Sequence, residues 1–512
     1  MWFYGNTIQL TFLHFFGIIE VRKQPDLKRG GNVMRNKRAQ VSLFDTYKEV
    51  TESYENNKPK LFRQLDELIE WETFIPARFF GAFHQKMGRP RVYSLVSFLK
   101  MLVLQRIFGY TEDSQLLLTL RHSSEMRDFC ELKKVPDAAK ITRFKQEFIV
   151  YIEEVFDTLV EQTEAICRQM DKELADCLVF DTTGIESYVA ENNPKFLNGK
   201  LSQAKAFAKK NPGYDPYKGV YSLMPDTALA NSNVKRQYIN GHFCYAQKAG
   251  ILTNGLGIVR DIALFDEDFK NAHPEMPIDK REDDPSLDKE IGDAKALLPI
   301  LTDFRSSHPS LHYSTFLGDA AFDSYDLYSA LLGSYGFQRA VIPLNLRNSA
   351  KALSADVNES GVPLCPADKT PMLFAGPCGG KNRSKRLKFV CPKSKVVPAE
   401  KGTTRKCFCD SPCTASPYGR CVYIYPDADK RLYPGLVRDS EEWNRLYAKR
   451  TAVERSINSF KDVLGIDGRK TSNTSTTKAD LFLAGITQLL GVLLASQLHD
   501  MSLARKIRKL AV

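Results

Sequence analysis

Hydrophobic positions recur every three to four residues between about 60 and 170, which is the spacing of amphipathic helices. The clearest helix follows Ser94, a residue type that caps helix starts, and ends at Gly109. Two further helices are predicted, one opening at Thr111 and one at Pro136-Asp137. The apolar positions of the first helix are Leu95, Phe98, Leu99, Leu102 and Val103. This part of the chain is therefore predicted to be all-helical.

The hydrophobic pattern changes after residue 176. Two short apolar runs each end in a carboxylate, 177–181 at Asp181 and 315–319 at Asp319, and they read as buried strands. Residues 254–255 are Asn-Gly, a strong hairpin signal. The other predicted elements are strands at 242–252, 257–265 and 339–343, helices at 288–307 and 324–333, and an extended loop at 191–240. This order indicates an α/β fold with one mixed sheet.

A third pattern is the uncharged stretch 481–498, whose 18 residues reach the lower limit for a membrane span. Four polar residues lie within it, which favours a buried helix: Thr487, Gln488, Ser496 and Gln497. The N-terminus has neither a basic n-region nor a small-residue cleavage site. We therefore expect a soluble, cytoplasmic protein without a membrane partner.

Composition adds a preference for a polyanionic partner. The 512 residues are 43% hydrophobic and 26% charged, ordinary for globular domains, with a formal net charge of +11 and a pI near 8.9. The helical region contributes Arg89, Arg91, Lys100, Arg106, Arg121, Arg127, Lys133, Lys134, Lys140, Arg143 and Lys145. Two interpretations stay open, short helices that dock on DNA or a helical domain with solvated basic faces.

Residues 347–425 form a separate, basic insert that holds seven of the eleven cysteines. In a cytoplasmic chain, clustered thiols indicate zinc before disulfides. The spacing is irregular, however, so free thiols in a loop remain the alternative. The candidate zinc ligands are Cys365, Cys391, Cys407, Cys409, Cys413 and Cys421. The excess of cations suggests that the insert lies against phosphates.

Residues 447–461 carry a second chemical pattern. Tyr447, Arg450, Glu454 and Lys461 are separated by 3, 4 and 7 residues, which would place them on one face of a helix. The opposite face would dock through Ala448, Val453, Ile457 and Phe460. A carboxylate flanked by cations suits a site that handles a metal and a phosphate. A solvated helix with ordinary charge pairs is the alternative.

Three carboxylates could meet at one edge of the predicted sheet. Asp181 and Asp319 end apolar strands, and Glu454 lies on the helix after the insert. Three such groups can hold two divalent cations about 3.5–4 Å apart, an arrangement that promotes in-line attack on a phosphodiester. Carboxylate oxygen is the ligand class that Mg²⁺ prefers.

At these residues the chain resembles the DDE transposases of bacterial insertion sequences, in the group with a Y-x2-R-x3-E-x6-K signature. Tyr447, Arg450, Glu454 and Lys461 have that spacing, and Asp181 and Asp319 match the first two acids of the family. Gly88-Arg-Pro-x-Tyr and the run that ends at Gly109 resemble the helical N-terminal domain common in these elements. The resemblance covers roughly 40–500, apart from parts of the insert.

The resemblance implies a fold and an activity. It implies an RNase H-like catalytic domain, with Mg²⁺ or Mn²⁺ held as two ions by Asp181, Asp319 and Glu454, and DNA contacts by Tyr447, Arg450 and Lys461. It also implies cut-and-paste transposition by a homodimer on double-stranded DNA, acting on terminal inverted repeats and target. The predicted domains are a poorly ordered extension at 1–39, a helical DNA-binding domain at 40–172, the catalytic domain at 173–346 and 426–512, and the Cys-rich insertion at 347–425. Met34 is the expected biological start.

Two other functions compete with this one. A non-transposing RNase H-like endonuclease would need only the acids, so the Tyr-Arg-Glu-Lys spacing argues against it. A domesticated or inactive relative that binds DNA as a regulator is the second alternative, and the presence of all three acids argues against that.

Overall fold

The computed structural model of the chain describes residues 47–48, 59–84, 90–239, 242–276, 291–347, 352–380, 383–400 and 402–510. The chain divides into two compact units, Met1–Asp66 and Glu67–Val512. Of the first unit, the described part is 47–48 and 59–66, which includes most of α3 (Lys60–Leu68). The expected start at Met34 and the expected extension at 1–39 lie outside the described residues.

The second unit begins with helices, as predicted. They are α4 (Ala77–Phe83), α5 (Leu95–Ile107), α6 (Asp113–His122), α7 (Ser124–Phe129), α8 (Ala138–Glu147), α9 (Ile149–Met170) and α10 (Lys172–Ala175). The Ser94 hydroxyl caps α5 by accepting a 2.9 Å hydrogen bond from the Ser97 amide. Gly109 follows α5 with a φ of +66°, a conformation that favours glycine. All residues of α5 are buried, including the charged Lys100 and Arg106.

One predicted helix start is wrong. α6 begins at Asp113 with Glu112 as its N-cap, not with Thr111. The shift has a physical reason, because the Thr111 carbonyl is taken by the Arg469 guanidinium at 2.9 Å and fixes the chain before the helix begins. By contrast, the predicted cap of α8 is confirmed, since the Asp137 carboxylate accepts a 2.9 Å hydrogen bond from the Lys140 amide.

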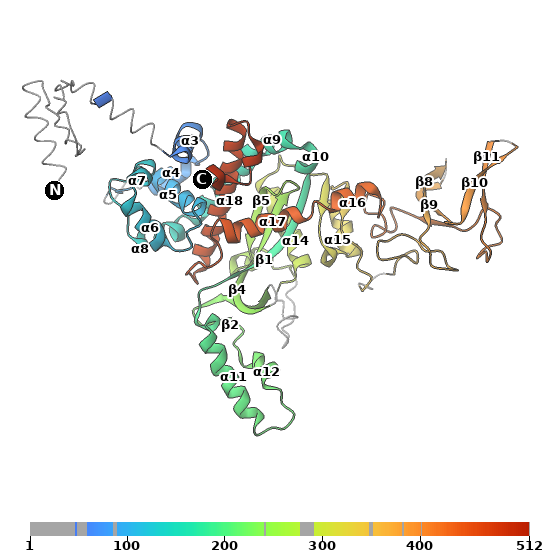
Figure 1. The fold of residues 1–512 in the computed structure, drawn as a ribbon, viewed down its shortest axis with the longest axis horizontal. Coiled ribbons are helices and arrows are strands. Elements are labelled where there is room, and N and C mark those ends of the chain that lie inside the picture. The colour runs from blue at the N-terminus through green and yellow to red at the C-terminus, as the bar shows by residue number, and fades with distance from the viewer. Residues whose placement is uncertain are drawn as a thin grey trace, which may run out of the picture. The chain divides into compact units, whose positions relative to one another are not determined.

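A mixed sheet follows the helices (Figure 1), which confirms the predicted α/β class. Its strands are β1 (Cys177–Glu186), β2 (Thr227–Ala228), β3 (Asn231–Ile239), β4 (His242–Asn254), β5 (Val259–Leu264), β6 (Thr315–Leu317) and β7 (Arg339–Val341). The strand order is β2-β3-β4-β1-β6-β7, and β5 also pairs with β4. β1, β4 and β5 are antiparallel neighbours, whereas β6 and β7 extend the sheet in parallel with β1.

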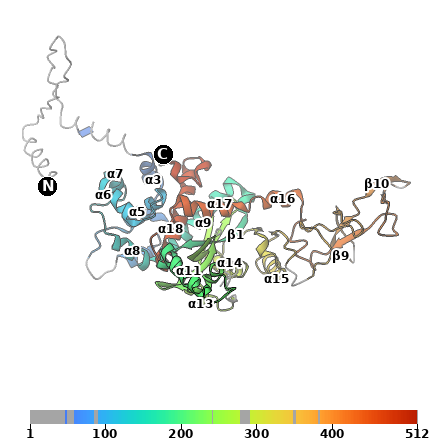
Figure 2. The same cartoon turned by 60° about the horizontal axis from the view of Figure 1, so that its bottom comes forward.

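Helices cover both faces of the sheet. α14 (Asp293–Ser307) contacts β1 and β4 (Figure 2), and a Cβ at Gly250 of β4 would lie 2.7 Å from the Ile300 side chain of α14. On the other face α9, α17 (Thr451–Asn458) and α18 (Thr474–Gln497) contact the strands. α13 (Glu267–Ala272) follows β5, and α15 (Tyr325–Ser329) lies between β6 and β7 in the chain.

The predicted loop at 191–240 is wrong in large part. It contains α11 (Pro194–Ala208), α12 (Pro216–Gly219), β2 and β3, and α11 and α12 contact one another (Figure 1). Asn193 caps α11 and Pro194 is its first residue, so the Asn-Pro pair that reads as a turn starts a helix instead. α11 buries only Ala204, and therefore gives no apolar periodicity to read.

The uncharged stretch lies in α18, as predicted for a core helix. Within the described part of the chain, α18 is the one helix long and apolar enough to cross a membrane by length and composition alone. Of its most apolar 18-residue window, 89% is buried inside the protein. Packing against α9 is close, since a Cβ at Gly485 would lie 2.6 Å from the Phe156 ring.

The insert forms small sheets of its own. β8 (Leu373–Gly380), β9 (Arg383–Val390) and β12 (Cys421–Ile424) make one sheet, and β10 (Ser394–Ala399) pairs only with β11 (Gly402–Cys407). A hydrophobic cluster supports the first sheet, formed by Leu344, Val357, Met372, Leu387, Phe389, Ile424 and Leu432.

A buried ion pair fixes the return from the insert. The Arg431 guanidinium meets the Asp323 carboxylate at 2.7 Å, and the two side chains are 3% and 0% exposed. Asp323 also accepts a 2.7 Å hydrogen bond from the Asn345 amide, where the chain leaves the sheet for the insert. The next helix, α15, is capped by Ser324, whose hydroxyl accepts a 3.3 Å hydrogen bond from the Leu327 amide.

A second buried charge network joins the N-terminal helices to α18. Asp480 of α18 lies 2.8 Å from the Lys145 ammonium, 2.7 Å from the Arg469 guanidinium and 3.8 Å from that of Arg106. Asp113 shares two of these cations, Lys145 at 3.3 Å and Arg469 at 3.0 Å. Burial lowers the pKa of Arg106 to about 10, with Asp480 opposing that shift. Removing one charge from such a network leaves the others buried and uncompensated.

Three cations of the basic set in the helical region contribute to no exposed face, whether that face docks on DNA or is solvated. Lys100, Arg106 and Lys145 are buried and hold the helices together, so they present no charge to solvent. Arg89 lies outside the described residues. The cations of that set that stay exposed include Arg121, Lys133, Lys134 and Arg143.

We expect Asp480→Asn to lower the free energy of unfolding by about 3–5 kcal/mol, because three buried cations would share Asp113 alone. Chemical denaturation of the full chain, followed by tryptophan fluorescence, measures this loss. The exposed Asp410→Asn is the matched control and should change stability by no more than about 0.5 kcal/mol. Equal effects of the two variants would contradict a structural role for the network.

Candidate active site

Two carboxylates lie on neighbouring strands at one level of the sheet. β1 and β6 are parallel, with Val179 opposite Leu317. Two residues further along each chain bring Asp181 and Asp319 to the same level and, by the two-residue period of strands, to the same face. Asp319 stands just after β6 and accepts a 2.8 Å hydrogen bond from the Ala321 amide, which fixes the turn that carries it.

Asp181 is not at a strand end as predicted. β1 continues to Glu186, and Asp181 pairs with Ile251 in the middle of the sheet. The strand continues because Thr182 and Thr183 are β-branched and pair with Gly250 and Ala249 of β4. A mid-strand carboxylate is held more rigidly than one on a turn, and one of its oxygens accepts a 2.8 Å hydrogen bond from the Thr182 amide.

Helix α17 brings the third carboxylate over this face. It contacts β1 and β4, and a Cβ at Gly257 would lie 2.9 Å from the Ala452 carbonyl, so the helix approaches the β4–β5 turn closely. Val453 and Ile457 are buried beneath it, as predicted. Glu454 keeps 42% of its side chain exposed, and its Oε1 accepts a 2.6 Å hydrogen bond from Arg450.

The predicted single helix over 447–461 is wrong. Tyr447 is the last residue of α16 (Glu441–Tyr447), residues 448–450 form a turn, and α17 begins at Thr451. Ala448, expected on the docking face, is exposed in that turn. Tyr447 and Arg450 nevertheless stay within electrostatic range of each other. Lys461 falls in a wider π-helical turn, Ser459–Val463, that follows α17.

The Asp181 carboxyl lies within electrostatic range of Asp319, Glu454 and Arg450. Burial, together with the negative charges of Asp319 and Glu454, raises the pKa of Asp181 to about 6. The Thr182 amide and the Arg450 guanidinium act in the opposite direction. The carboxylate of Asp181 is therefore destabilised where it stands, as expected for a group placed to meet a cation.

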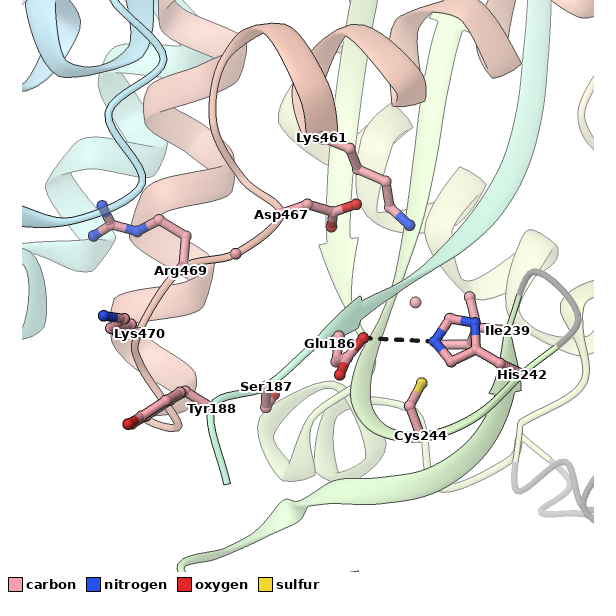
Figure 3. Close-up of a pocket in the computed structure, with 12 residues that line it drawn as sticks. Glu186, Ser187, Tyr188, Ile239, His242, Cys244, Lys461, Asp467, Arg469 and Lys470 are labelled. Atoms are coloured by element: carbon pink, nitrogen blue, oxygen red, sulfur yellow. Dashed lines mark ion pairs between the residues drawn. The ribbon is translucent and has the colours of Figure 1, made fainter. Parts of the chain in front are cut away.

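Lys461 lies apart from the acids. It lines a cavity of about 350 Å³ near the Glu186 end of β1, together with Asp467 and Lys470 (Figure 3). Five residues of strand separate Asp181 from Glu186, or roughly 16 Å. Lys461 lowers the pKa of Asp467, which burial otherwise raises. The structure thus places Arg450 near the three acids, Tyr447 next to Arg450, and Lys461 at the cavity by the Glu186 end of β1.

The cavity holds a metal-ligand group that the sequence analysis missed. Glu186, His242 and Cys244 have ligand atoms within 4.8 Å of one another, the only such trio among the described residues. Figure 3 shows the 3.5 Å ion pair between His242 and Glu186. The available signal was the two-residue spacing of His242 and Cys244, which puts both on one face of β4. Cys244 is buried and burial raises the pKa of its thiol to about 12.

The three predicted acids do not form such a trio, because their oxygens are not all within 4.8 Å of one another. This spacing still suits two cations. Asp181, Asp319 and Glu454 are the residues that would hold such ions, through carboxylate oxygens.

The predicted zinc cysteines separate into two classes. Cys391 lies against Cys407, and Cys365 lies against Cys413, with Cys365 also in electrostatic range of Cys391. Cys409 donates instead to the Ser411 carbonyl at 3.4 Å. Cys421 lies in β12, opposite Val390.

Comparison with known families gives one match. A family model described as "Transposase domain (DUF772)" matches residues 49–147, which include α4 to α8. No curated protein matches the chain. The match supports a transposase family and suggests a transposase enzyme in general. It ends before Asp181 and so does not cover the three acids.

We expect Asp181→Asn to stabilise the metal-free protein at pH 7.5. The pKa of about 6 in the folded state exceeds the ordinary 3.8, so the folded protein takes up a proton more readily than the unfolded one. The carboxylate therefore costs stability above pH 6, by up to about 3 kcal/mol, and this cost disappears below pH 3.8. Urea denaturation at pH 7.5 and at pH 4.5 measures the difference.

Asp326→Asn is the control for this prediction, since Asp326 is exposed at the start of α15. Its effect should be small and similar at both pH values. A destabilising effect of Asp181→Asn at pH 7.5 would show that Asp181 holds the fold together and does not await a cation.

Proposed function

We propose that the chain is a DNA transposase that cleaves the ends of its element and joins them to target DNA by a DDE mechanism. The observation that carries the proposal is the meeting of Asp181, Asp319 and Glu454 over one face of the sheet, in a chain whose N-terminal helices match a transposase domain. The acids come from two parallel strands and a helix far apart in sequence.

An RNase H-like catalytic domain is part of the proposal. The order β5-β4-β1-β6-β7, with the first three strands antiparallel and the last two parallel, supports it. The insert lies between β7 and α17, so the third acid reaches the sheet only after the chain has returned through Arg431.

Mg²⁺ or Mn²⁺ fits the three acids. Their donor atoms are carboxylate oxygens, and the raised pKa of Asp181 marks a buried negative charge beside two others. Asp181, Asp319 and Glu454 would hold two ions. When bound, such ions activate a water or a 3′-hydroxyl and stabilise the leaving oxygen of the phosphodiester.

The neighbouring side chains would position the DNA. Arg450 neutralises Glu454 through a 2.6 Å bond and is 18% exposed, so its guanidinium can also meet a phosphate at the site. Tyr447 stands next to Arg450 at the end of α16, where its ring can contact the same nucleotide. Lys461, which lines the cavity at the Glu186 end of β1, would bind a phosphate away from the cleaved bond.

The partners follow from this chemistry. We propose double-stranded DNA, with the element's terminal inverted repeats and a target as substrates, and a homodimer on paired ends. A cytoplasmic location in contact with the nucleoid belongs to the same proposal. The net charge of +11 supports a polyanionic partner.

The acids are tested with Mg²⁺ on DNA that carries the inverted repeats flanking the gene. Asp181→Asn, Asp319→Asn and Glu454→Gln should each lower cleavage more than about a hundredfold, since even outer partners of metal ligands cost 10- to 100-fold. DNA binding by these variants should persist, and Asp326→Asn should cleave normally. Unchanged cleavage by the three variants would overturn the proposal.

The same assay separates the alternatives. A regulator would bind the repeats without cutting them, and an endonuclease would cut without joining the ends to target DNA. Joined products from the native chain exclude both.

Lys461→Ala should weaken DNA binding without abolishing cleavage at saturating protein. Loss of one phosphate contact lowers the slope of log affinity against log salt by about 1. Binding titrations from low to moderate salt measure the slope, with Lys430→Ala, in the segment that returns from the insert, as the control. An unchanged slope would place Lys461 outside the DNA interface.

A further inference from the structure

Four cysteines of the insert come together from four separate segments. Cys365 precedes β8, Cys391 follows β9, Cys407 ends β11, and Cys413 lies between β11 and β12. Cys391 and Cys407 are in side-chain contact, as are Cys365 and Cys413, and Cys365 and Cys391 link the two pairs electrostatically. Cys365 and Cys391 are 4% and 2% exposed.

The backbone around these thiols is built as tight turns. The Ser394 amide donates to the Cys391 carbonyl at 3.0 Å, closing Cys391-Pro-Lys-Ser394. The Lys369 amide donates to the Cys365 carbonyl at 2.9 Å, closing a second turn that also begins Cys-Pro. In the first turn the Lys393 amide acts on the Cys391 sulfur and opposes the rise in its pKa that burial causes.

Gly419 packs against the Cys391–Cys407 pair. Gly419 has a φ of +82°, and a Cβ there would lie 3.1 Å from the Cβ of Cys391 and 3.4 Å from the Sγ of Cys407. Hydrogen bonds hold the loop on both sides of Gly419. The Pro417 carbonyl accepts one from the Cys407 amide at 2.8 Å, and the Arg420 carbonyl accepts one from the Cys391 amide at 2.9 Å. The loop is therefore shaped to the two cysteines.

Few other contacts stabilise the part of the insert that contains β10 and β11. β10 and β11 form an isolated two-stranded hairpin, with Val396 and Phe408 exposed. Ser394 pairs with Cys407 at the base of that hairpin, beside Cys391. A hairpin alone is marginally stable in water, and small lobes without a core commonly use a metal.

We propose that Cys365, Cys391, Cys407 and Cys413 bind one structural zinc ion, which fastens the β10–β11 hairpin to the rest of the insert. Four thiolates in a closed tetrahedron are the ligand set of structural zinc sites. Cys378, Cys409 and Cys421 are not ligands. This proposal is independent of the DNA chemistry.

A single ion would require the two cysteine pairs to approach one another. Zn–S bonds of about 2.3 Å place the sulfurs of a tetrahedral site about 3.8 Å apart. The four sulfurs form two neighbouring pairs and are not all within 4.8 Å of one another. The Cys365 and Cys413 side chains would move toward the Cys391–Cys407 pair as the metal binds. Nearby cations, including Arg420 beside Cys413, offset the negative charge of four thiolates.

Metal content tests the proposal. The full chain, purified under reducing conditions without chelator, should carry about one zinc, and Cys391→Ser or Cys413→Ser should lower this to under about a tenth. Cys409→Ser and Cys421→Ser are matched controls and should retain the metal. His242→Ala should also retain it, which separates this site from the Glu186–His242–Cys244 group.

Three measurements cover a failure of the serine variants to fold. Cys413→His should keep the zinc, because imidazole replaces a thiolate ligand. Co²⁺ in place of zinc should give the thiolate charge-transfer bands and strong visible bands of a tetrahedral site. Chelation should speed hydrogen exchange in β9 to β12 but not in α18. Native protein without zinc, zinc retained in Cys391→Ser, or disulfides joining Cys391 to Cys407 and Cys365 to Cys413 would each overturn the proposal.

Discussion

The position of the proposed site depends on a carboxylate that takes no part in it. Asp480, deep in α18, meets Lys145, Arg469 and Arg106, and so ties α8, α5 and the segment after α17 to one point. Arg106 also donates to the Leu464 and Gly465 carbonyls at 3.2 Å, and Gly465 packs directly on Gly109. Because that segment continues from α17, the network fixes where the helix of Glu454 ends. Buried ion networks add little net stability compared with apolar packing, but they strongly disfavour other arrangements of the same elements.

The grouped acids of the proposed site lower the stability of the folded chain. A carboxylate in the middle of β1, beside two more acids, raises the free energy of the metal-free protein, and Arg450 relieves only part of that repulsion. The sheet tolerates this because neighbouring strands and α17 hold Asp181 in place regardless. Strain of this kind concentrates at functional sites. In the proposed function, binding of a cation would release a repulsion already present in the folded chain.

Local sequence signals predicted the elements that rest on local chemistry. Ser94 and Asp137 cap the helices that they were expected to cap, the Asn254-Gly255 hairpin lies where it was predicted, and α18 is a core helix. The three acids could be singled out from sequence order, but the length of β1 could not, since the pairing with β4 decides it. Nothing in 447–461 signals a break, because the chain has neither Gly nor Pro there and the turn at 448–450 is set by tertiary packing. The burial of Lys145 could not be predicted for a similar reason, because its partner Asp480 lies more than 300 residues away in the sequence.

The ion pair between Arg431 and Asp323 has an evolutionary consequence. Asp323 and Arg431 both bind the backbone of Asn345, where the insert begins, and Arg431 lies where the chain returns from it. The two junctions with the sheet are therefore held together independently of the residues between them. Lineages could lengthen, shorten or replace the intervening residues while the catalytic sheet stayed unchanged. Selection on the insert is thereby uncoupled from selection on chemistry. Asp323 is only four residues from Asp319. A replacement of the insert that removed the Asp323–Arg431 ion pair would therefore also disturb the position of Asp319.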